Sequence, residues 1–196
     1  TIACSGRRGS TDMRTLPFVL LALMVATTTA ACRSGNVKPS IPTAAPVDVD
    51  RFMGDWYVIA HIPSFPERDA YAAVESYAKL PDGRIQTTFR FRKGALDGPE
   101  KTMHPIGTVK PDGGGAVWGM QFIWPIQAEY VIVDLAPDYS RTIVGRSKRD
   151  YVWLMARTPS LPAAELAAAI EKIRTLGYDT SKLRMVPQAA AKAAPP

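Results

Sequence analysis

The chain has 196 residues, of which 46% are hydrophobic and 21% are charged, as in an ordinary globular protein. This composition excludes a collagen-like repeat, a disulfide-rich scaffold, a wholly disordered chain and a polytopic membrane protein. The formal net charge of +6 is compatible with a nucleic-acid binder, so the position of the charges along the chain has to be considered.

The first part of the chain has the pattern of a secretory signal peptide. Arg14 precedes an apolar run from Leu16 to Ala26, and the small residues Ala30 and Ala31 follow it. The run is shorter than the roughly 20 apolar residues that a membrane-spanning helix needs. We therefore expect residues 1–31 to be upstream residues and a leader that is removed on export.

A cysteine follows the small residues, and Thr29-Ala30-Ala31-Cys32 resembles the lipobox of bacterial lipoproteins. In that family the cysteine becomes the first residue of the mature protein and carries a diacylglycerol and an N-acyl chain. The resemblance implies lipidation at Cys32, and Arg33 in the following position implies sorting to the outer membrane. The alternative is ordinary cleavage nearby, which leaves a free thiol.

Loss of the leader changes the charge and the cysteine content. It removes three arginines, one aspartate and Cys4, so the net charge falls from +6 to +4 and Cys32 is the one cysteine left. Residues 32–47 are rich in proline and small residues, which predicts a lipid-anchored flexible tether. Residues 48–187 are predicted to be the folded domain, and 188–196 a disordered tail.

From Gly54 onward, apolar residues recur at every second position, which is typical of strands with one buried face. Trp56, Val58, Ala60 and Ile62 are expected on one face of a first strand. The other predicted strands are 73–78, 84–92, Met103–Lys110, Ala116–Ile123, Ala128–Leu135, Arg141–Arg146 and Tyr151–Arg157. Turn sequences separate neighbouring strands, and eight such strands predict an antiparallel meander. Closed on itself, it is a barrel whose interior holds side chains or one small ligand.

One helix is predicted after the strands. Leu166, Ile170, Ile173 and Leu176 recur at helical spacing, and Gly177 supplies the stop. Its single apolar stripe predicts that the helix packs outside the barrel, before a short final strand at Lys182–Val186. The fold class is therefore all-β: an eight-stranded antiparallel up-and-down barrel with one C-terminal α-helix.

Three short motifs make the chain resemble the lipocalins, and with the leader the bacterial outer-membrane lipocalins related to apolipoprotein D. Gly54-Asp55-Trp56 resembles the first family motif, Pro137-Asp138-Tyr139 the second, and Trp153–Pro159, with Arg157, the third. The resemblance implies that Gly54, Trp56 and Arg157 are structural, with the guanidinium of Arg157 lying over the indole of Trp56 at the closed base.

The apolar faces of the strands predict an interior that holds a lipophilic ligand. The expected lining residues are Phe89, Phe91, Met120, Phe122, Tyr130, Ile132, Trp153 and Met155. Burying an acyl chain there contributes about 0.8 kcal/mol per methylene. The alternative is that the same side chains fill a solid core.

Other chemistries find little support. His61 and His104 are the only histidines and no cysteine accompanies them in the folded domain, so no metal site and no cofactor are expected. No Ser/His/Asp arrangement or carboxylate pair stands out, which argues against an enzyme. An exported, tethered domain is not expected to bind nucleic acid.

Three functions therefore stay open. The first is non-enzymatic storage or transport of a fatty acid or lysophospholipid at the outer membrane, in envelope maintenance or stress, as the family resemblance implies. The second is a lipid-modifying enzyme that uses the barrel as its reaction chamber. The third is a structural lipoprotein with a filled barrel. Whether the chain forms a homodimer, and which side of the membrane it faces, also stays open.

Overall fold

The computed structural model describes residues 40–189; the predicted leader (1–31), the predicted lipidation site Cys32 and residues 33–39 and 190–196 lie outside them. The strands of the described part are β1 (Gly54–Ile62), β2 (Ala70–Lys79), β3 (Ile85–Lys93), β4 (Glu100–Met103), β5 (Ile106–Val109), β6 (Val117–Ile123), β7 (Ile126–Leu135), β8 (Arg141–Gly145), β9 (Val152–Ala156) and β10 (Arg184–Met185). Its α-helices are α1 (Val49–Phe52) and α2 (Ala163–Thr175). Neither of these helices has the length and apolar character needed to cross a membrane.

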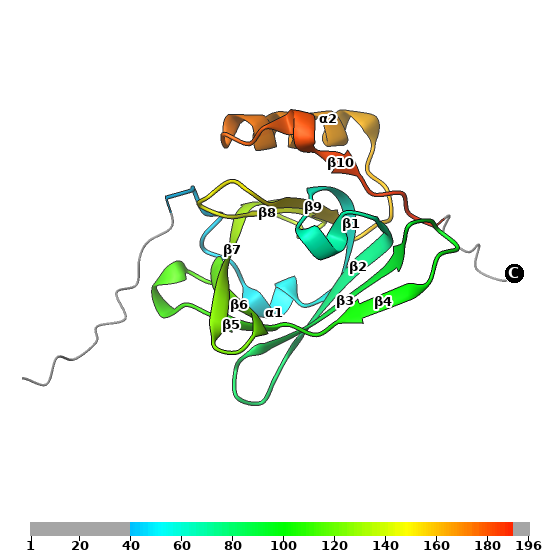
Figure 1. Ribbon diagram of the computed structural model, residues 1–196. Helices are drawn as coiled ribbons and strands as arrows, with labels where there is room; N and C mark the ends of the chain where they lie inside the picture. The colour runs from blue at the N-terminus through cyan, green and yellow to red at the C-terminus, as the bar shows by residue number, and fades with distance from the viewer. Residues whose placement is uncertain (1–39, 190–196) are drawn as a thin grey trace, which may run out of the picture. The chain divides into compact units, whose positions relative to one another are not determined.

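The strands form one antiparallel barrel, closed by pairing between its first and last members (Figure 1). Neighbours pair in the order β1-β2-β3-β5-β6-β7-β8-β9, and β9 pairs back onto β1. β10 adds to β1, where Ala60 lies opposite Met185. The predicted up-and-down barrel with a C-terminal helix and a short final strand is confirmed.

The predicted strand Met103–Lys110 is wrong in its bounds, because two short strands share that place in the wall. β4 pairs with one half of β3 and β5 with the other. Pro105 lies between them and has no N–H to offer the ladder. Its carbonyl still accepts a hydrogen bond from the Thr87 N–H, at 3.0 Å. β4 and β5 therefore act as one interrupted strand, which makes eight strand positions around the wall.

Two buried cores lie on the two faces of the barrel wall. One lies inside the barrel and the other lies outside it against α2. Trp56 and Val58 belong to the interior core, but Ala60 and Ile62 belong to the outer one. The expectation that all four share a face is wrong, because the register of β1 shifts between Val58 and Ala60. A bulge of this kind inverts the side-chain alternation beyond it.

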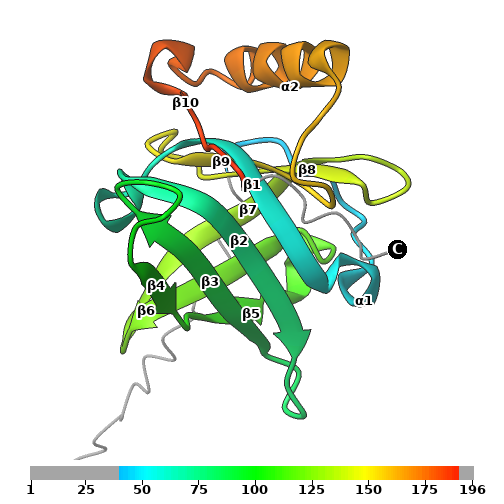
Figure 2. The ribbon, with the colours of Figure 1, turned by 90° about the vertical axis from the view of Figure 1, so that its right-hand side faces the viewer.

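α2 lies across the outside of the barrel, as the periodicity predicts (Figure 2). Ala169 and Ile173 are its buried residues, and Leu176 is buried just beyond its end. Arg149, in the β8–β9 connection, donates from Nε to the Leu176 carbonyl at 2.7 Å. This bond satisfies one of the carbonyls that a helix end leaves free. The helix is thus fixed by its apolar side and at its C-terminal end.

Residues 40–47, here called the strap, are not the flexible tether that was predicted. Ile41 is 3% exposed and packs in the outer core, while Val47 is 7% exposed and packs in the interior core. The Ala44 N–H donates to the Ile132 carbonyl at 2.9 Å, and the Val47 N–H donates to the Gly114 carbonyl at 2.8 Å. Apolar side chains spaced along a proline-rich segment thus dock it on the barrel.

The predicted tail also begins too early. Gln188 donates from Nε2 to the carbonyls of Val58, at 2.7 Å, and Ala73, at 3.2 Å. These bonds bridge β1 and β2 just beyond the Tyr57–Val74 pair, where their ladder ends. The folded domain thus extends at least to Gln188.

The closed end of the barrel is organised by Arg157. Its guanidinium carbon lies 3.8 Å from the centre of the Trp56 ring. The same guanidinium donates to the carbonyls of Arg51, Phe52 and Met53, at the end of α1, at 2.9–3.1 Å. Gly54 opens β1 directly beside it, since a Cβ there would lie 3.4 Å from Nη1 of Arg157.

The second motif lies at the same end. Tyr139 accepts the Asp48 N–H on its hydroxyl at 2.8 Å, and the guanidinium of Arg51 lies 4.0 Å from its ring centre. The Tyr139 carbonyl accepts from Nε of Arg157 at 3.4 Å. The three motifs, far apart in sequence, thus form one plug that closes the barrel.

Candidate functional site: the barrel cavity

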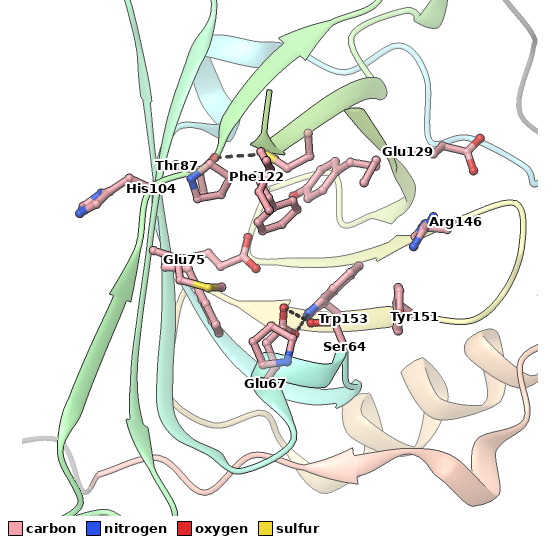
Figure 3. Close-up of a pocket in the computed structure, with 18 residues that line it drawn as sticks. Ser64, Glu67, Glu75, Thr87, His104, Phe122, Glu129, Arg146, Tyr151 and Trp153 are labelled. Atoms are coloured by element: carbon pink, nitrogen blue, oxygen red, sulfur yellow. Dashed lines mark hydrogen bonds between the residues drawn. The ribbon is translucent and has the colours of Figure 1, made fainter. Parts of the chain in front are cut away.

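A cavity of about 530 Å³ occupies the barrel interior away from the closed end (Figure 3). Its wall comes from β2, β3, β4, β6, β7 and β9, and the β1–β2 connection covers part of it with Ser64, Pro66 and Glu67. Carbon and sulfur atoms of Phe89, Met120 and Trp153 form much of the wall. This volume lies within the range of known small-molecule sites, roughly 300–1,000 Å³.

The structure places all eight predicted lining residues on the interior side of the barrel, but they do not all reach the cavity. Five of them line it: Phe89, Met120, Phe122, Tyr130 and Trp153. The other three, Phe91, Ile132 and Met155, are buried in the interior core without lining the cavity. The alternation along the strands therefore identifies the interior face, but it does not tell which interior residues line the cavity.

A chain of polar groups, which the apolar pattern did not reveal, lies at the inner part of the cavity. The Tyr130 and Tyr77 hydroxyl oxygens are 2.7 Å apart, and the Tyr77 hydroxyl also donates to the Glu75 carboxylate. Figure 3 shows Glu75 projecting from the wall into the cavity. The one sequence signal was the spacing of Glu75 and Tyr77, which places both on the same face of β2.

Burial raises the pKa of all three of these hydrogen-bonded side chains. Desolvation raises the pKa of Glu75 from 4.5 to about 7, the hydrogen bond from Tyr77 opposes the rise, and the negative charge of Glu67 adds to it. Desolvation likewise raises the pKa of Tyr77 and of Tyr130 well above their usual value, so both remain hydroxyl donors. Glu75 is thus a carboxyl group that changes charge near neutral pH inside an apolar cavity.

A second carboxylate ties the β1–β2 connection to the wall. Glu67, which is 4% exposed, accepts from Nε1 of Trp153 at 2.8 Å and from the Ser64 hydroxyl at 2.9 Å. Nδ1 of the buried His61 lies 3.7 Å from the same carboxylate. These contacts hold the connection over the cavity as a fixed cover and orient the indole of Trp153.

The side chains that line the cavity suit an apolar ligand better than a metal ion. Among residues 40–189, no group of three or more His, Cys, Asp or Glu side chains is placed to hold a metal ion. His104 borders the cavity, but its ring lies 3.4 Å from the Thr88 hydroxyl at an exposed position. The arrangement can enclose a hydrocarbon chain and offer it one titratable carboxyl group.

Comparison with known proteins agrees with this architecture. The chain is 29% identical to temperature-induced lipocalin-1 of Arabidopsis thaliana over 163 residues, covering 77% of this chain and 84% of that one. It is 28% identical to the outer membrane lipoprotein Blc of Citrobacter freundii over 182 residues, covering 91% of this chain and all of that protein.

A solved structure and a family description extend the comparison. Insecticyanin from the tobacco hornworm Manduca sexta aligns with a TM-score of 0.59 at 17% identity, covering 80% of this chain and 87% of that one. That likeness concerns the fold alone. The lipocalin-like domain family matches residues 47–188, which span the barrel, α2 and β10. The chain therefore belongs to the lipocalin family.

Proposed function

We propose that this protein binds a single-chain lipid, a fatty acid or a lysophospholipid, in its barrel cavity and stores or transports it at the bacterial outer membrane. Lipocalins bind small hydrophobic ligands, and the observation that carries the proposal is the 530 Å³ cavity with its wall of Phe89, Met120, Phe122 and Trp153. Each methylene of an acyl chain buried against such a wall contributes about 0.8 kcal/mol. The same cavity argues against a filled, purely structural barrel.

The proposed location is supported by the sequence and by the relatives. The leader, Cys32 and Arg33 have the pattern of an outer-membrane lipoprotein, and the relative from Citrobacter freundii is named an outer membrane lipoprotein. We propose that residues 1–31 are removed, that Cys32 is acylated, and that residues 33–39 remain as the tether. We also propose a role in envelope maintenance or stress, as the family resemblance implies.

Ligand binding is tested by native mass spectrometry of the purified protein and by fluorescence titration with laurate. We expect co-purified lipid in the spectra, and quenching of the Trp153 emission on addition of laurate. Ala128→Phe places a ring in the cavity and should abolish both signals, because Ala128 lines it. Ala167→Phe is the matched control, since Ala167 is exposed on α2. A wild-type barrel without lipid that does not respond to laurate would overturn the proposal.

An enzyme is the second candidate, and Glu75 is the observation that favours it. A carboxyl group with a pKa of about 7 is suited to proton transfer near neutral pH. However, residues 40–189 contain no cysteine, so the cavity has no thiol nucleophile. Native spectra detect an enzyme that changes the mass of its lipid, and chromatography of the extracted lipid detects an isomerisation; a carrier returns its lipid unchanged in both measurements. We favour the non-enzymatic carrier.

A further inference from the structure

The exposed apolar side chains of the barrel are concentrated at one end. Antiparallel strands alternate in direction, so the β1–β2, β3–β4, β6–β7 and β8–β9 connections share the end opposite α1 (Figure 2). Within residues 40–189, seven large hydrophobic residues are exposed, and Met185 is the one that belongs to β10 rather than to these connections or the strand ends beside them. The other six, here called the mouth rim, are Phe65, Leu96, Phe122, Ile123, Trp124 and Ile126.

The tip of the β6–β7 hairpin is the most apolar part of the mouth rim. Its sequence from Gln121 to Gln127 contains no charged residue. Ile123 is 73% exposed, Trp124 82% and Ile126 70%. Contiguous exposed apolar groups on a soluble domain mark a contact surface, and Trp is enriched where a membrane meets water.

The mouth rim is continuous with the cavity. Phe122 and Ile123 line the cavity and are also exposed on the outer surface. Across the mouth, Phe65 is 76% exposed and the guanidinium of Arg68 lies 4.8 Å from its ring centre. An aromatic ring beside a cation suits the boundary between acyl chains and phosphate groups. The apolar side chains of the mouth rim therefore give a lipid a path from such a boundary to the apolar wall of the cavity.

The chain also enters the described structure at this end. The Ser40 N–H donates to the Ser147 hydroxyl at 3.0 Å, and the Ser40 carbonyl accepts from Arg149 at 3.5 Å. Both partners lie in the β8–β9 connection, which is part of the mouth. Ser40 lies eight positions after Cys32, and eight residues span at most about 28 Å. An acylated Cys32 would thus hold the mouth, rather than the closed end, next to the membrane.

We propose that the mouth rim inserts into the boundary between headgroups and acyl chains of a phospholipid bilayer, so that the cavity opens onto the lipid from which its ligand is drawn. The proposal rests on the proposed function for the origin of the ligand. A second copy of the chain is the competing occupant of this surface. It does not by itself account for the entry of the chain at the mouth.

The test uses residues 33–196, which lack Cys32 but contain both hydrophobic cores. Vesicles of phosphatidylethanolamine and phosphatidylglycerol are sedimented with this chain, and the bound fraction gives a partition coefficient. Trp124→Gln combined with Ile126→Gln should lower the coefficient at least tenfold, since neither residue lines the cavity and both are exposed. Ala167→Gln, at an exposed position of α2 outside the mouth rim, should change it less than twofold.

Two further measurements make the outcomes distinct. Lipids brominated along their acyl chains should quench wild-type emission through Trp124, and the double variant should lose that quenching. Laurate binding should be equal in the wild type and the double variant. Equal vesicle partitioning of the wild type and the double variant would overturn the proposal. So would light scattering that shows a dimer for the wild type and a monomer for the double variant. A wild type that does not bind laurate would instead refute the proposed function, independently of the partition coefficient.

Discussion

At the scale of single residues, Arg157 holds the closed end through contacts that a lysine cannot reproduce. Its planar guanidinium stacks on Trp56 while it donates to three carbonyls at the end of α1. Arg157→Lys keeps the charge but loses the planar group that stacks on Trp56 and donates to several carbonyls at once. We expect the free energy of unfolding, measured in urea, to fall by about 2 kcal/mol.

A matched control is available on α2. Arg174 is exposed and pairs with Glu171 through Nε, at 2.8 Å, and Nη2. An exposed pair contributes little to stability, so Arg174→Lys should leave the urea midpoint unchanged. Equal losses in the two variants would contradict the role given to Arg157.

Glu75 should make the stability of the barrel depend on pH. The pKa of Glu75 is about 7 in the folded chain and 4.5 for the side chain in water, the value taken for the unfolded state. Between these pH values the folded state therefore binds more protons than the unfolded state. Stability therefore falls as the pH rises from about 4.5 to about 7 and then levels off, by at most about 3 kcal/mol. Glu75→Gln should remove this fall and leave the variant more stable than the wild type at pH 8.

Urea denaturation at pH 5 and pH 8 measures the difference. Asp97→Asn is the control for exchanging a carboxylate for an amide, because Asp97 is exposed in the β3–β4 connection. It should keep the wild-type dependence on pH. A Glu75→Gln variant that still loses stability across this range would show that another group is responsible.

At the scale of elements, periodicity predicts the strands and α2 but not the points where the pattern breaks. The bulge after Val58 transfers Ala60 and Ile62 to the outer core, and nothing in the local sequence marks it. Pro105 could have signalled the break between β4 and β5, since it removes a ladder donor. The strap was missed because Ile41 and Val47 gain their partners from strands that are distant in sequence.

The candidate site was predictable in its apolar part alone. Phe89, Met120 and Trp153 follow the alternation of their strands and line the cavity. Glu67 and Glu75 line it too, although a carboxylate in a sequence ordinarily indicates a solvent-exposed surface. Their burial depends on partners from other elements, Trp153 for Glu67 and the Tyr77–Tyr130 pair for Glu75. Sequence spacing does not reveal such partners.

Docking of the strap can be tested at Gly115. Its φ of +79° disfavours a side chain, and a Cβ there would lie 2.1 Å from the carbonyl oxygen of Val47. Gly115→Ala should therefore displace the strap and lower the free energy of unfolding by more than about 2 kcal/mol. Faster hydrogen exchange of the Ala44 amide, which bonds to Ile132, should accompany the loss.

Gly83→Ala separates the two causes. Gly83 has a similar φ of +82°, but nothing lies within 4 Å of a Cβ at that position. It should cost about 1 kcal/mol through the backbone alone and leave exchange at Ala44 unchanged. If the two variants lose the same stability, the strap contributes nothing through this contact.

At the scale of the whole molecule, the two ends of the barrel have different tasks. The closed end is a plug of aromatic rings and hydrogen-bonded carbonyls around Trp56 and Arg157. The open end contains the cover fixed by Glu67, the mouth rim, and the point at which the chain enters at Ser40. A rigid closed end allows the open end to carry exposed apolar groups without loss of the fold.

In the proposed arrangement, acylation of Cys32 supplies the permanent anchor, because contact through the mouth rim alone is reversible. Two or more acyl chains on Cys32 hold a protein far more firmly than a few inserted side chains, since each buried methylene contributes about 0.8 kcal/mol. Cys32→Ala should therefore move the protein from the membrane fraction of the cell to the soluble fraction. Cys4→Ala is the control and should change nothing, because Cys4 lies upstream of the leader. Equal membrane recovery of both variants would show that the rim or the uncleaved leader, and not acylation of Cys32, retains the chain.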